Sequence, residues 1–455
     1  MTTIPETQTF SYLQLANWIL RPLDYMQANA RQYGDLFYAH WGLLDWVLVS
    51  HPEAIKQILT QDTGELISAS GELNSILRPL LGEHSITMLS GQAHKARRKL
   101  IMPPFHGERL KVYADLIRDI TLSLMAEMQV GQHFRARDVM QKITMRVILQ
   151  AVFGLHAGER YRRLEYLLAA RLNMLSSPIA STLVFFPALQ KNLGPWSPGA
   201  KLAAMSAEID TLLYAEIAER RASLEPERND ILSRLLLVRD EEGQGLSDAE
   251  LHDELMTLLV AGHETTATAL AWSLYWAHHQ PEIKAKIQQE IQQANVTEDA
   301  LGLTKLPYLG AVCNETLRIY PVAMLTFGRL VRQPITVLEY DVPPGTIVVG
   351  SIYLLHHRED LYPQPDQFRP ERFLERQYSP FEFMPFGAGA RRCVGAALAM
   401  YELKIALGTI LTHFDLSLSS DRPIPPERRG ITLGMKGGVE MVFRGKRTVP
   451  QPALV

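Results

Sequence analysis

The chain has 455 residues, 47% of them hydrophobic, and a formal net charge of −3 from 46 basic and 49 acidic side chains. A chain of this size can bury a large core, and its nearly balanced charge gives no indication of a nucleic acid, a polyanionic substrate or an anionic membrane as partner. The two cysteines, Cys313 and Cys393, are too few for a disulfide framework and fit a reducing cytosol.

Three apolar stretches bear on membrane contact. Polar residues interrupt the stretch 13–23, so we expect no signal peptide. The stretch Leu255 to Ala277 has the length of a membrane span but carries His263 and Glu264 at its centre, which favours a buried helix. The stretch Ser177 to Leu189 is too short to span a bilayer; it could line a substrate entrance, touch a membrane surface or form an ordinary buried loop. We therefore expect a cytoplasmic protein without a transmembrane anchor, and a peripheral position at a membrane surface stays open.

Helices are expected through most of the chain after a β-hairpin near the amino terminus. Two β-rich runs separated by a short turn predict the hairpin within residues 37–50. Apolar residues recur at helical spacing in four segments, 110–128, 139–153, 161–175 and 203–222. The longest helix is expected from Ser247, which can form a capping box with Glu250, to about His278.

Three further helices and two β-rich regions are expected in the rest of the chain. Pro281 opens a helix that runs to about Gln293, and another begins near Tyr308 and stops before Pro321. The last helix begins near Cys393 and ends near His413, and β-rich runs lie within 326–351 and 415–443. No repeat or composition shift marks a boundary, so residues 1–455 are expected to form one mainly α domain with a smaller β region.

The segment around Cys393 is the strongest chemical signal. Residues 386–395 have the sequence FGAGARRCVG. A thiolate at the start of a helix faces free backbone N–H groups and the positive end of the helix dipole, which stabilise its charge. Gly387 and Gly389 allow the backbone to approach a flat cofactor. A lone cysteine on an apolar helix is more often a small core residue, and that is the interpretation we give to Cys313.

This segment resembles the haem-binding signature of the cytochrome P450 family, F-x-x-G-x-R-x-C-x-G. Every fixed position matches: Phe386, Gly389, Arg391, Cys393 and Gly395. The resemblance covers nearly the whole chain and implies the cytochrome P450 fold of the soluble bacterial type, with haem b between the longest helix and the last. It also implies that Cys393 ligates the iron, that Phe386 packs near the sulfur and that Arg391 pairs with a haem propionate.

The segment AGHETT at 261–266 places an acid and an alcohol side by side in an apolar helix. A helical threonine can simply bond to a carbonyl one turn earlier, whereas an unpaired buried carboxylate is costly. The segment is similar to the family signature in which Ala261 lies beside the cofactor and Gly262 opens a local helix distortion. There Glu264 and Thr265 relay protons to bound dioxygen.

Two groups of charged residues complete the resemblance. His94 and Arg98 are four residues apart on one helical face; an exposed basic face is the alternative, but the resemblance implies that they bind haem propionates. Arg329 and His357 are weaker candidates for the same role. The other group is a buried ion-pair network that the resemblance implies. It would join Glu315 and Arg318, on the expected helix before Pro321, to Arg372 in a later segment.

The resemblance implies a monooxygenase that inserts one oxygen atom of O2 into a hydrophobic substrate and reduces the other to water. Two alternatives are a peroxide-using peroxygenase or isomerase and a non-catalytic haem sensor. Glu264 and Thr265 favour dioxygen, because proton delivery is needed mainly for that oxidant. Long-chain fatty acids and terpenoids are the candidate substrates, with Arg78 and Arg171 as candidate carboxylate anchors.

No flavin or iron–sulfur domain fits beside the haem domain, so electrons are expected from a separate ferredoxin or flavodoxin-type donor. Five basic residues could form a patch on which this electron donor docks, or they could simply be a solvated basic surface. The five are Lys95, Arg97, Lys99, Arg392 and Lys404.

Overall fold

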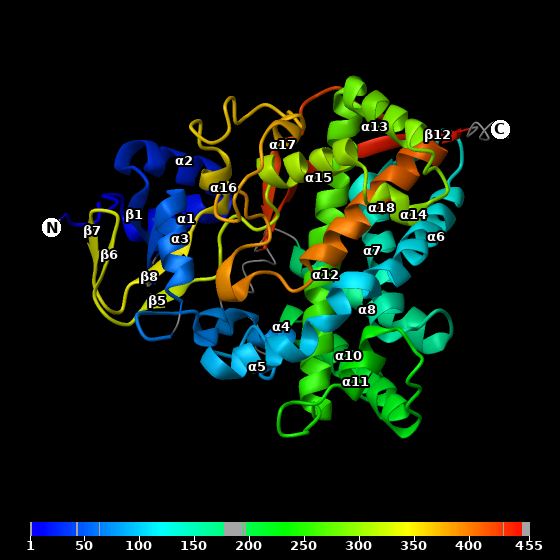
Figure 1. The fold of residues 1–455 in the computed structure, drawn as a ribbon, viewed down its shortest axis with the longest axis horizontal. Coiled ribbons are helices and arrows are strands. Elements are labelled where there is room, and N and C mark those ends of the chain that lie inside the picture. The colour runs from blue at the N-terminus through cyan, green and yellow to red at the C-terminus, as the bar shows by residue number, and fades with distance from the viewer. Residues whose placement is uncertain are drawn as a thin grey trace.

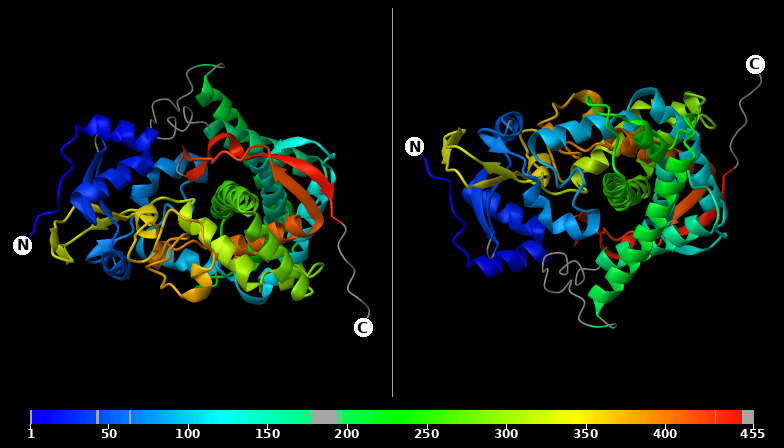
Figure 2. Two further views of the ribbon diagram at one scale, coloured as in Figure 1. Left: turned by 90° about the horizontal axis from the view of Figure 1, so that it is seen from above. Right: turned by 90° about the horizontal axis from the view of Figure 1, so that it is seen from below.

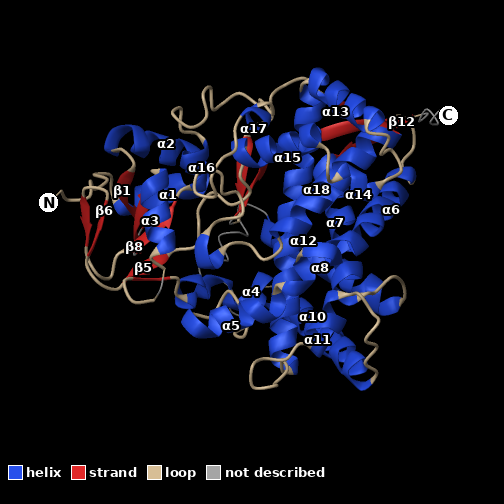
Figure 3. Ribbon diagram, viewed as in Figure 1, coloured by secondary structure: helices blue, strands red, loops and turns tan. Residues whose placement is uncertain are grey.

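The computed structural model describes residues 2–41, 44–62, 64–176, 194, 197–430 and 432–447. Helices form most of it, and a strand-rich part lies at the left of Figures 1 and 3. The first half of the chain contains α1 (Ser11–Leu20), α2 (Pro22–Tyr33), β1 (Leu36–Trp41), β2 (Leu44–Val49), α3 (Pro52–Thr60), β3 (Ile67–Ser68), α4 (Arg78–Leu81), α5 (Gly91–Ile101), α6 (Val112–Ala126), β4 (His133–Arg135), α7 (Ala136–Phe153), α8 (Glu159–Ser176) and α10 (Pro198–Ala222).

The second half contains α11 (Ile231–Leu237), α12 (Asp248–His279), α13 (Pro281–Gln293), α14 (Ala300–Leu303), α15 (Pro307–Ile319), β5 (Arg329–Val331), β6 (Ile335–Val337), β7 (Tyr340–Val342), β8 (Ile347–Gly350), α16 (Ile352–His356), α17 (Arg372–Glu375), α18 (Ala396–His413), β9 (Phe414–Leu418), β10 (Pro426–Arg429), β11 (Thr432–Met435) and β12 (Glu440–Lys446). The predicted mainly α class with a smaller β part is confirmed.

The long helix α12 runs through the middle of the molecule and is seen end-on in Figure 2. Its start is fixed locally, because the Ser247 hydroxyl accepts from the Glu250 N–H at 3.3 Å while the Glu250 carboxylate accepts from the Ser247 N–H at 2.9 Å. This predicted capping box satisfies two N–H groups that a helix end leaves without partners.

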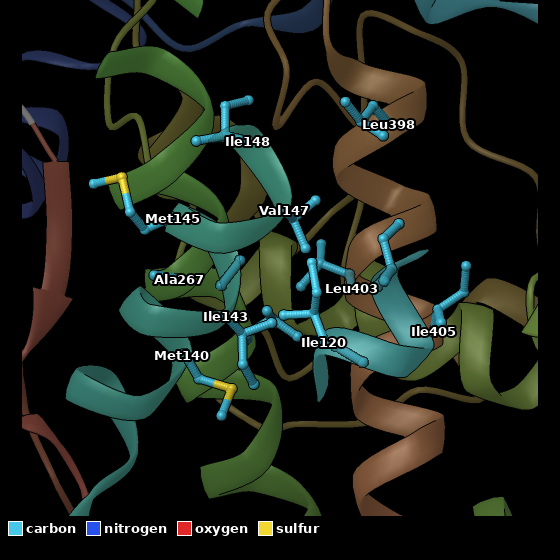
Figure 4. Close-up of a cluster of buried hydrophobic side chains, with 14 of the residues drawn as sticks. Ile120, Met140, Ile143, Met145, Val147, Ile148, Ala267, Leu398, Leu403 and Ile405 are labelled. Atoms are coloured by element: carbon cyan, nitrogen blue, oxygen red, sulfur yellow. The ribbon is translucent and has the colours of Figure 1, made fainter. Parts of the chain in front are cut away.

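The core is built where α7 packs along α12. Figure 4 shows α7 in teal close to α12 in green, with α18 in brown beside them. Ile143 and Val147 of α7, Ala267 of α12 and Leu403 of α18 are buried in one hydrophobic cluster. Burying one such aliphatic side chain fully contributes roughly 1.5–3 kcal/mol, so this contact stabilises the packing of the middle of α12. Among the residues that the structure describes, we find no helix of the length and apolarity that a membrane crossing requires.

The strands form small sheets at the edges of the helical body. The predicted amino-terminal hairpin is confirmed as antiparallel β1 and β2. It belongs to a five-stranded sheet of order β1-β2-β8-β5-β3, in which β2 and β8 are parallel. Between β2 and β8 the chain passes through the helical body, so the sheet brings together residues 46–49 and 347–350, which lie far apart in the sequence. The last region pairs β12 with β4 and β9, and β10 with β11.

Candidate functional site

Cys393 lies in a loop directly before α18. Its backbone N–H donates to the carbonyl of Phe386 at 2.9 Å, which closes the loop, and the helix starts three residues later at Ala396. The N–H of Gly395 donates to the sulfur. The sulfur therefore faces a helix start, where free N–H groups and the helix dipole favour a thiolate.

The two cysteines differ in environment. The pKa of the Cys393 thiol is raised overall, because burial outweighs the hydrogen bond from the Gly395 N–H and the charges of Arg98 and Arg392, which lower it. Cys393 is exposed to solvent, even though dense protein surrounds it. Cys313 is fully buried, and burial raises the pKa of its thiol to about 12. Cys393 is thus available as a ligand, and Cys313 is a core residue as expected.

The surroundings of the two loop glycines, Gly387 and Gly389, differ. Both have a positive φ, +66° at Gly387 and +68° at Gly389. A Cβ on Gly389 would lie 2.8 Å from the carbonyl oxygen of Leu59, so close packing on α3 requires a glycine there. A Cβ on Gly387 would meet open space, which leaves room for a flat group beside the loop.

Four basic groups gather near the cysteine loop. His94 on α5 is buried, and its pKa is lowered to about 4 by burial and by the charges of Arg391, Arg98 and Arg329. Burial and the charge of Arg329 lower the pKa of Arg391 to about 10. Asp62 pairs with Arg329 at 2.9 Å. Since one carboxylate cannot balance this cluster, further anionic groups such as the two propionates of haem fit it well.

Arg391 is held by backbone carbonyls. Its Nη1 donates to Ile86 at 3.0 Å, and its Nη2 donates to Ala69 at 2.6 Å and to Leu89. Three carbonyls are fewer than the five N–H donors of a guanidinium group. Arg391 is therefore fixed in orientation and still has capacity to bind an anion.

His357 has a different environment from Arg329. Its Nδ1 lies 2.8 Å from the carbonyl oxygen of Tyr353, and burial together with the charge of Arg318 lowers its pKa to about 3. These contacts make His357 a packing residue next to α16. Arg329 is the member of that weaker pair that joins the basic cluster.

The expected distortion at Gly262 is wrong, because α12 is helical without interruption from Asp248 to His279. A Cβ on Gly262 would lie 2.8 Å from Cδ1 of Ile148 on α7. The glycine is therefore needed for the close approach of α7 to α12. The Thr265 hydroxyl donates to the carbonyl of Ala261, one turn earlier. Its oxygen keeps lone pairs that can accept a proton, and Ala261 itself is exposed.

Glu264 contacts α7 rather than Thr265. Its Oε1 accepts from Nη2 of Arg137 at 2.6 Å, and its Oε2 accepts from Nε2 of Gln141 at 2.5 Å. Neither partner was predicted from the sequence. A signal was present, because residues 137 and 141 are one helical turn apart beside a predicted helix and share one face. That face could not be matched to Glu264 without the fold.

His263 also connects α12 to α7. Its Nδ1 lies 2.8 Å from the hydroxyl of Thr144, and burial together with the charge of Arg137 lowers its pKa to about 3. The imidazole is therefore neutral at physiological pH. Two successive residues of α12 thus face α7.

Comparison with known proteins decides the family. The model of the family described as Cytochrome P450 matches residues 6–439. The chain belongs to the cytochrome P450 family. It is 36% identical over 429 residues to cytochrome P450 135B1 of Mycobacterium tuberculosis, which covers 94% of this chain and 88% of that protein. It is 34% identical to cytochrome P450 135A1 of the same organism, with 98% and 94% covered.

A solved P450 has the same fold. The structure of retinoic acid bound cyanobacterial CYP120A1 superposes with a TM-score of 0.85 and 24% sequence identity, covering 98% of this chain and 99% of that one. Membership of the P450 family supports a haem-thiolate monooxygenase in general, which uses O2, a hydrophobic substrate and a redox partner.

The buried network expected near α15 is present in this P450. Arg318 donates to the two oxygens of Glu315 at 2.7 and 2.9 Å, and Arg372 donates to Oε1 at 3.1 Å. All three side chains are buried. Removing one partner of such a network strands a buried charge, at a cost of about 3–5 kcal/mol. The network therefore joins α15 to the start of α17 and performs no chemistry.

The two candidate substrate anchors differ in burial. Arg171 on α8 is 4% exposed, and its Nη2 donates to the carbonyls of Leu80 and Pro79 at 3.2 and 3.4 Å. Burial lowers its pKa. Arg78 is exposed. The segment Ser177 to Leu189, expected to line an entrance or touch a membrane, lies outside the described residues.

Two members of the expected docking patch are less exposed than expected, since Arg97 is buried and Lys404 is half-buried. Arg97 is buried and forms ion pairs with Glu254 at 2.9 Å and with Glu250, so its assignment to the patch is wrong. Nζ of Lys404 donates to the carbonyl of Thr304 at 2.9 Å. Arg97 was predicted to be solvated because its acidic partners lie 153 and 157 residues away in the sequence.

Three members of the patch remain exposed, and they are Lys95, Lys99 and Arg392. Lys99 is paired with Glu241 at 2.8 Å. The patch is therefore smaller than the sequence indicated, and Lys95 and Arg392 are its stronger members.

Proposed function

We propose that this P450 is a haem b monooxygenase that hydroxylates a hydrophobic substrate. One C–H bond, O2, two electrons and two protons give an alcohol and water. The observation that carries the proposal is an exposed cysteine at a helix start beside a buried basic cluster. Residues 1–455 would act as one catalytic domain in the cytoplasm.

The residues that would hold haem b are those of the cysteine loop and the basic cluster. Cys393 would bind iron through its sulfur, Arg391, Arg98 and His94 would bind the propionates, and Phe386 would pack near the sulfur. The remaining loop positions, Gly389 and Gly395, shape the backbone. Haem bound there would supply the iron on which O2 is reduced, and thiolate donation favours O–O cleavage, as is known for this family.

We infer that Thr265 and Glu264 supply protons for this reduction. The Thr265 hydroxyl can accept a proton from one side while giving its own to dioxygen on the other. Glu264 is the acid on the adjacent residue. The function of Ala261 would be to leave space for dioxygen, because its small side chain is exposed on the same turn.

The substrate is proposed to be a long-chain fatty acid, with a terpenoid as the alternative. By analogy with the family, Val322 and Met324, before β5, would line the substrate pocket, and both are apolar. The similar cyanobacterial P450 has retinoic acid bound, which is a hydrophobic carboxylic acid. The buried Arg171 on α8 is the proposed anchor for such a carboxylate.

Carbon monoxide binding to the reduced protein tests the proposal. Because we assign the thiolate to Cys393, the wild type should show the strongly red-shifted Soret band of thiolate ligation. Cys393→Ser should lose that band and all substrate hydroxylation, while Cys313→Ser keeps both. Loss of the band in Cys313→Ser with retention in Cys393→Ser would refute the assignment.

A further inference from the structure

The segment 82–89, between α4 and α5, is held against the first half of α12. The N–H of His84 donates to Oδ2 of Asp253 at 2.7 Å, and Oγ of Ser85 lies 2.7 Å from Oγ1 of Thr257. Asp253 and Thr257 are four residues apart and share one face of the helix. Figure 1 shows α4 and α5 next to α12. This face of α12 therefore fixes the path of the segment.

A buried ion pair completes this contact. Nη1 of Arg97 on α5 donates to Oε1 of Glu254 at 2.9 Å and to the carbonyl of His84 at 3.0 Å. Nη2 of Arg97 also pairs with Glu250. Glu254 is 1% exposed, and the nearby N–H of Ile86 favours its ionised form. The ion pair thus contacts the segment at a carbonyl and at an N–H group.

The same segment holds Arg391. Two of the backbone carbonyls that accept from its guanidinium group, those of Ile86 and Leu89, belong to the segment. Ile86 therefore interacts with Glu254 through its N–H and with Arg391 through its carbonyl. One residue connects the ion pair between α5 and α12 to the cysteine loop.

The ion pair supplies geometry more than stability. Burial raises the pKa of Glu254 to about 7, although the charge and hydrogen bond of Arg97 and the N–H of Ile86 lower it. The cost of burial therefore outweighs the attraction of these partners, as is common for buried ion pairs. A charge-assisted hydrogen bond nevertheless fixes the orientation of its groups. The titratable groups around Glu254 are Arg97 of α5, Glu250 and Asp253 of α12 and His84 of the segment.

We propose that Arg97 and Glu254 are positioning residues for haem binding, which act through the segment 82–89 on Arg391. This inference rests on the proposed pairing of Arg391 with a haem propionate. The carbonyl of Ile86 directs one nitrogen of Arg391, and the ion pair fixes where that carbonyl lies. Partners behind the ligands of a metal site orient those ligands and strengthen binding in the same way.

A double-mutant cycle tests this role. Glu254→Gln and Arg97→Met are each made in the wild type and in Arg391→Met. Each haem-loaded protein is mixed with excess apomyoglobin at about pH 8, where Glu254 is ionised. The measurements are the rate of haem transfer and the hydrogen exchange of the amides in the segment. Glu216→Gln on α10 is the matched control, because Glu216 is also buried and pairs with Arg220 at 2.9 Å.

We expect Glu254→Gln and Arg97→Met to accelerate haem transfer several-fold and to speed the hydrogen exchange of Ile86, since the segment opens more often. Neither should accelerate haem transfer further in Arg391→Met. Arg97→Lys should recover part of the loss, and Glu216→Gln should resemble the wild type. Equal acceleration in both backgrounds, or none, would overturn the inference.

The pH dependence supplies a readout that a merely structural contact would not change. Below a pH of about 7 the wild type carries the neutral acid, as Glu254→Gln carries a neutral amide. Their haem-transfer rates should therefore converge as the pH falls from about 8 to about 6. Rates that differ by the same factor throughout would also overturn the inference.

Two further outcomes separate this inference from the assignment on which it rests. Unchanged haem transfer in Arg391→Met would refute the pairing of Arg391 with a propionate. Faster transfer there but not in the ion-pair variants refutes only the role of Arg97 and Glu254. If Arg97→Met does not fold, Glu254→Gln, a change of nearly equal size and shape, still tests the proposal.

Discussion

Arg171 shows how the environment of a single residue bears on substrate choice. Its guanidinium group is buried, and within the described part of the chain its hydrogen bonds go to two backbone carbonyls of α4, while the charge of Asp210 raises its pKa less than burial lowers it. A buried cation with an incomplete set of partners is a suitable anchor for a carboxylate. A purely structural connection between α8 and α4 would make no distinction between acid and alcohol ligands.

We predict that a long-chain fatty acid binds more tightly than its matched alcohol, and that Arg171→Met removes the difference. A charged hydrogen bond of about 1.5–3 kcal/mol implies a change of roughly tenfold or more. Titrations that follow the haem spin state measure both affinities, with the exposed Arg78→Ala as control. Equal affinities in the wild type would remove the anchor, and tight binding of a cyclic terpenoid without any response to acids would overturn the preference.

At the scale of elements, His252 joins α10 to α12. Its two ring nitrogens lie 3.0 Å from Asp210 on α10 and 2.9 Å from Asp253 on α12. Asp253 also accepts from the N–H of His84 at 2.7 Å. Its carboxylate occupies the place of a Cβ on Gly82. The amino-terminal half of α12 thus holds both α10 and the loop after α4.

This connection predicts a pH-dependent stability. Burial lowers the pKa of His252, but the two aspartates outweigh it and raise the pKa to about 9. A raised pKa means that the stabilisation is complete below the unfolded pKa of about 6.5 and is lost as the pH rises through about 9. We expect the unfolding temperature to fall across this range, and less so in His252→Asn. The exposed His106→Asn is the control, and parallel profiles in all three proteins would contradict the prediction.

At the scale of the whole molecule, the remaining exposed basic residues predict how an electron donor approaches. We expect Lys95→Glu and Arg392→Glu to slow reduction by an acidic ferredoxin, most strongly at low ionic strength, because salt screens such steering. Lys99→Glu should have less effect, since Glu241 already neutralises that charge. Lys446→Glu on β12, far from α5 in Figure 1, is the control. If the reduction rate changes neither with ionic strength nor with these charge reversals, the patch is not the docking site of the electron donor.

Local sequence patterns were sufficient to predict the helices and the cysteine loop. The capping box of Ser247 and Glu250 is a contact across three residues, so the start of α12 was predictable. The loop of Phe386 to Gly395 is equally local, because its closing hydrogen bond spans seven residues. Hydrophobic periodicity reports which face of a helix is buried, and it needs no knowledge of the partner.

The partners of charged side chains depended on the tertiary structure. The sequence by itself determined that Glu264 sits in an apolar helix and needs compensation; only the fold decided that Arg137 and Gln141 provide it, because packing brings together residues that are more than 120 positions apart. Arg97 was expected at the surface for the same reason, and the fold buries it against two glutamates of α12. Ion pairs act through space over a few ångströms, so their identity follows from how helices pack and not from the order of residues along the chain.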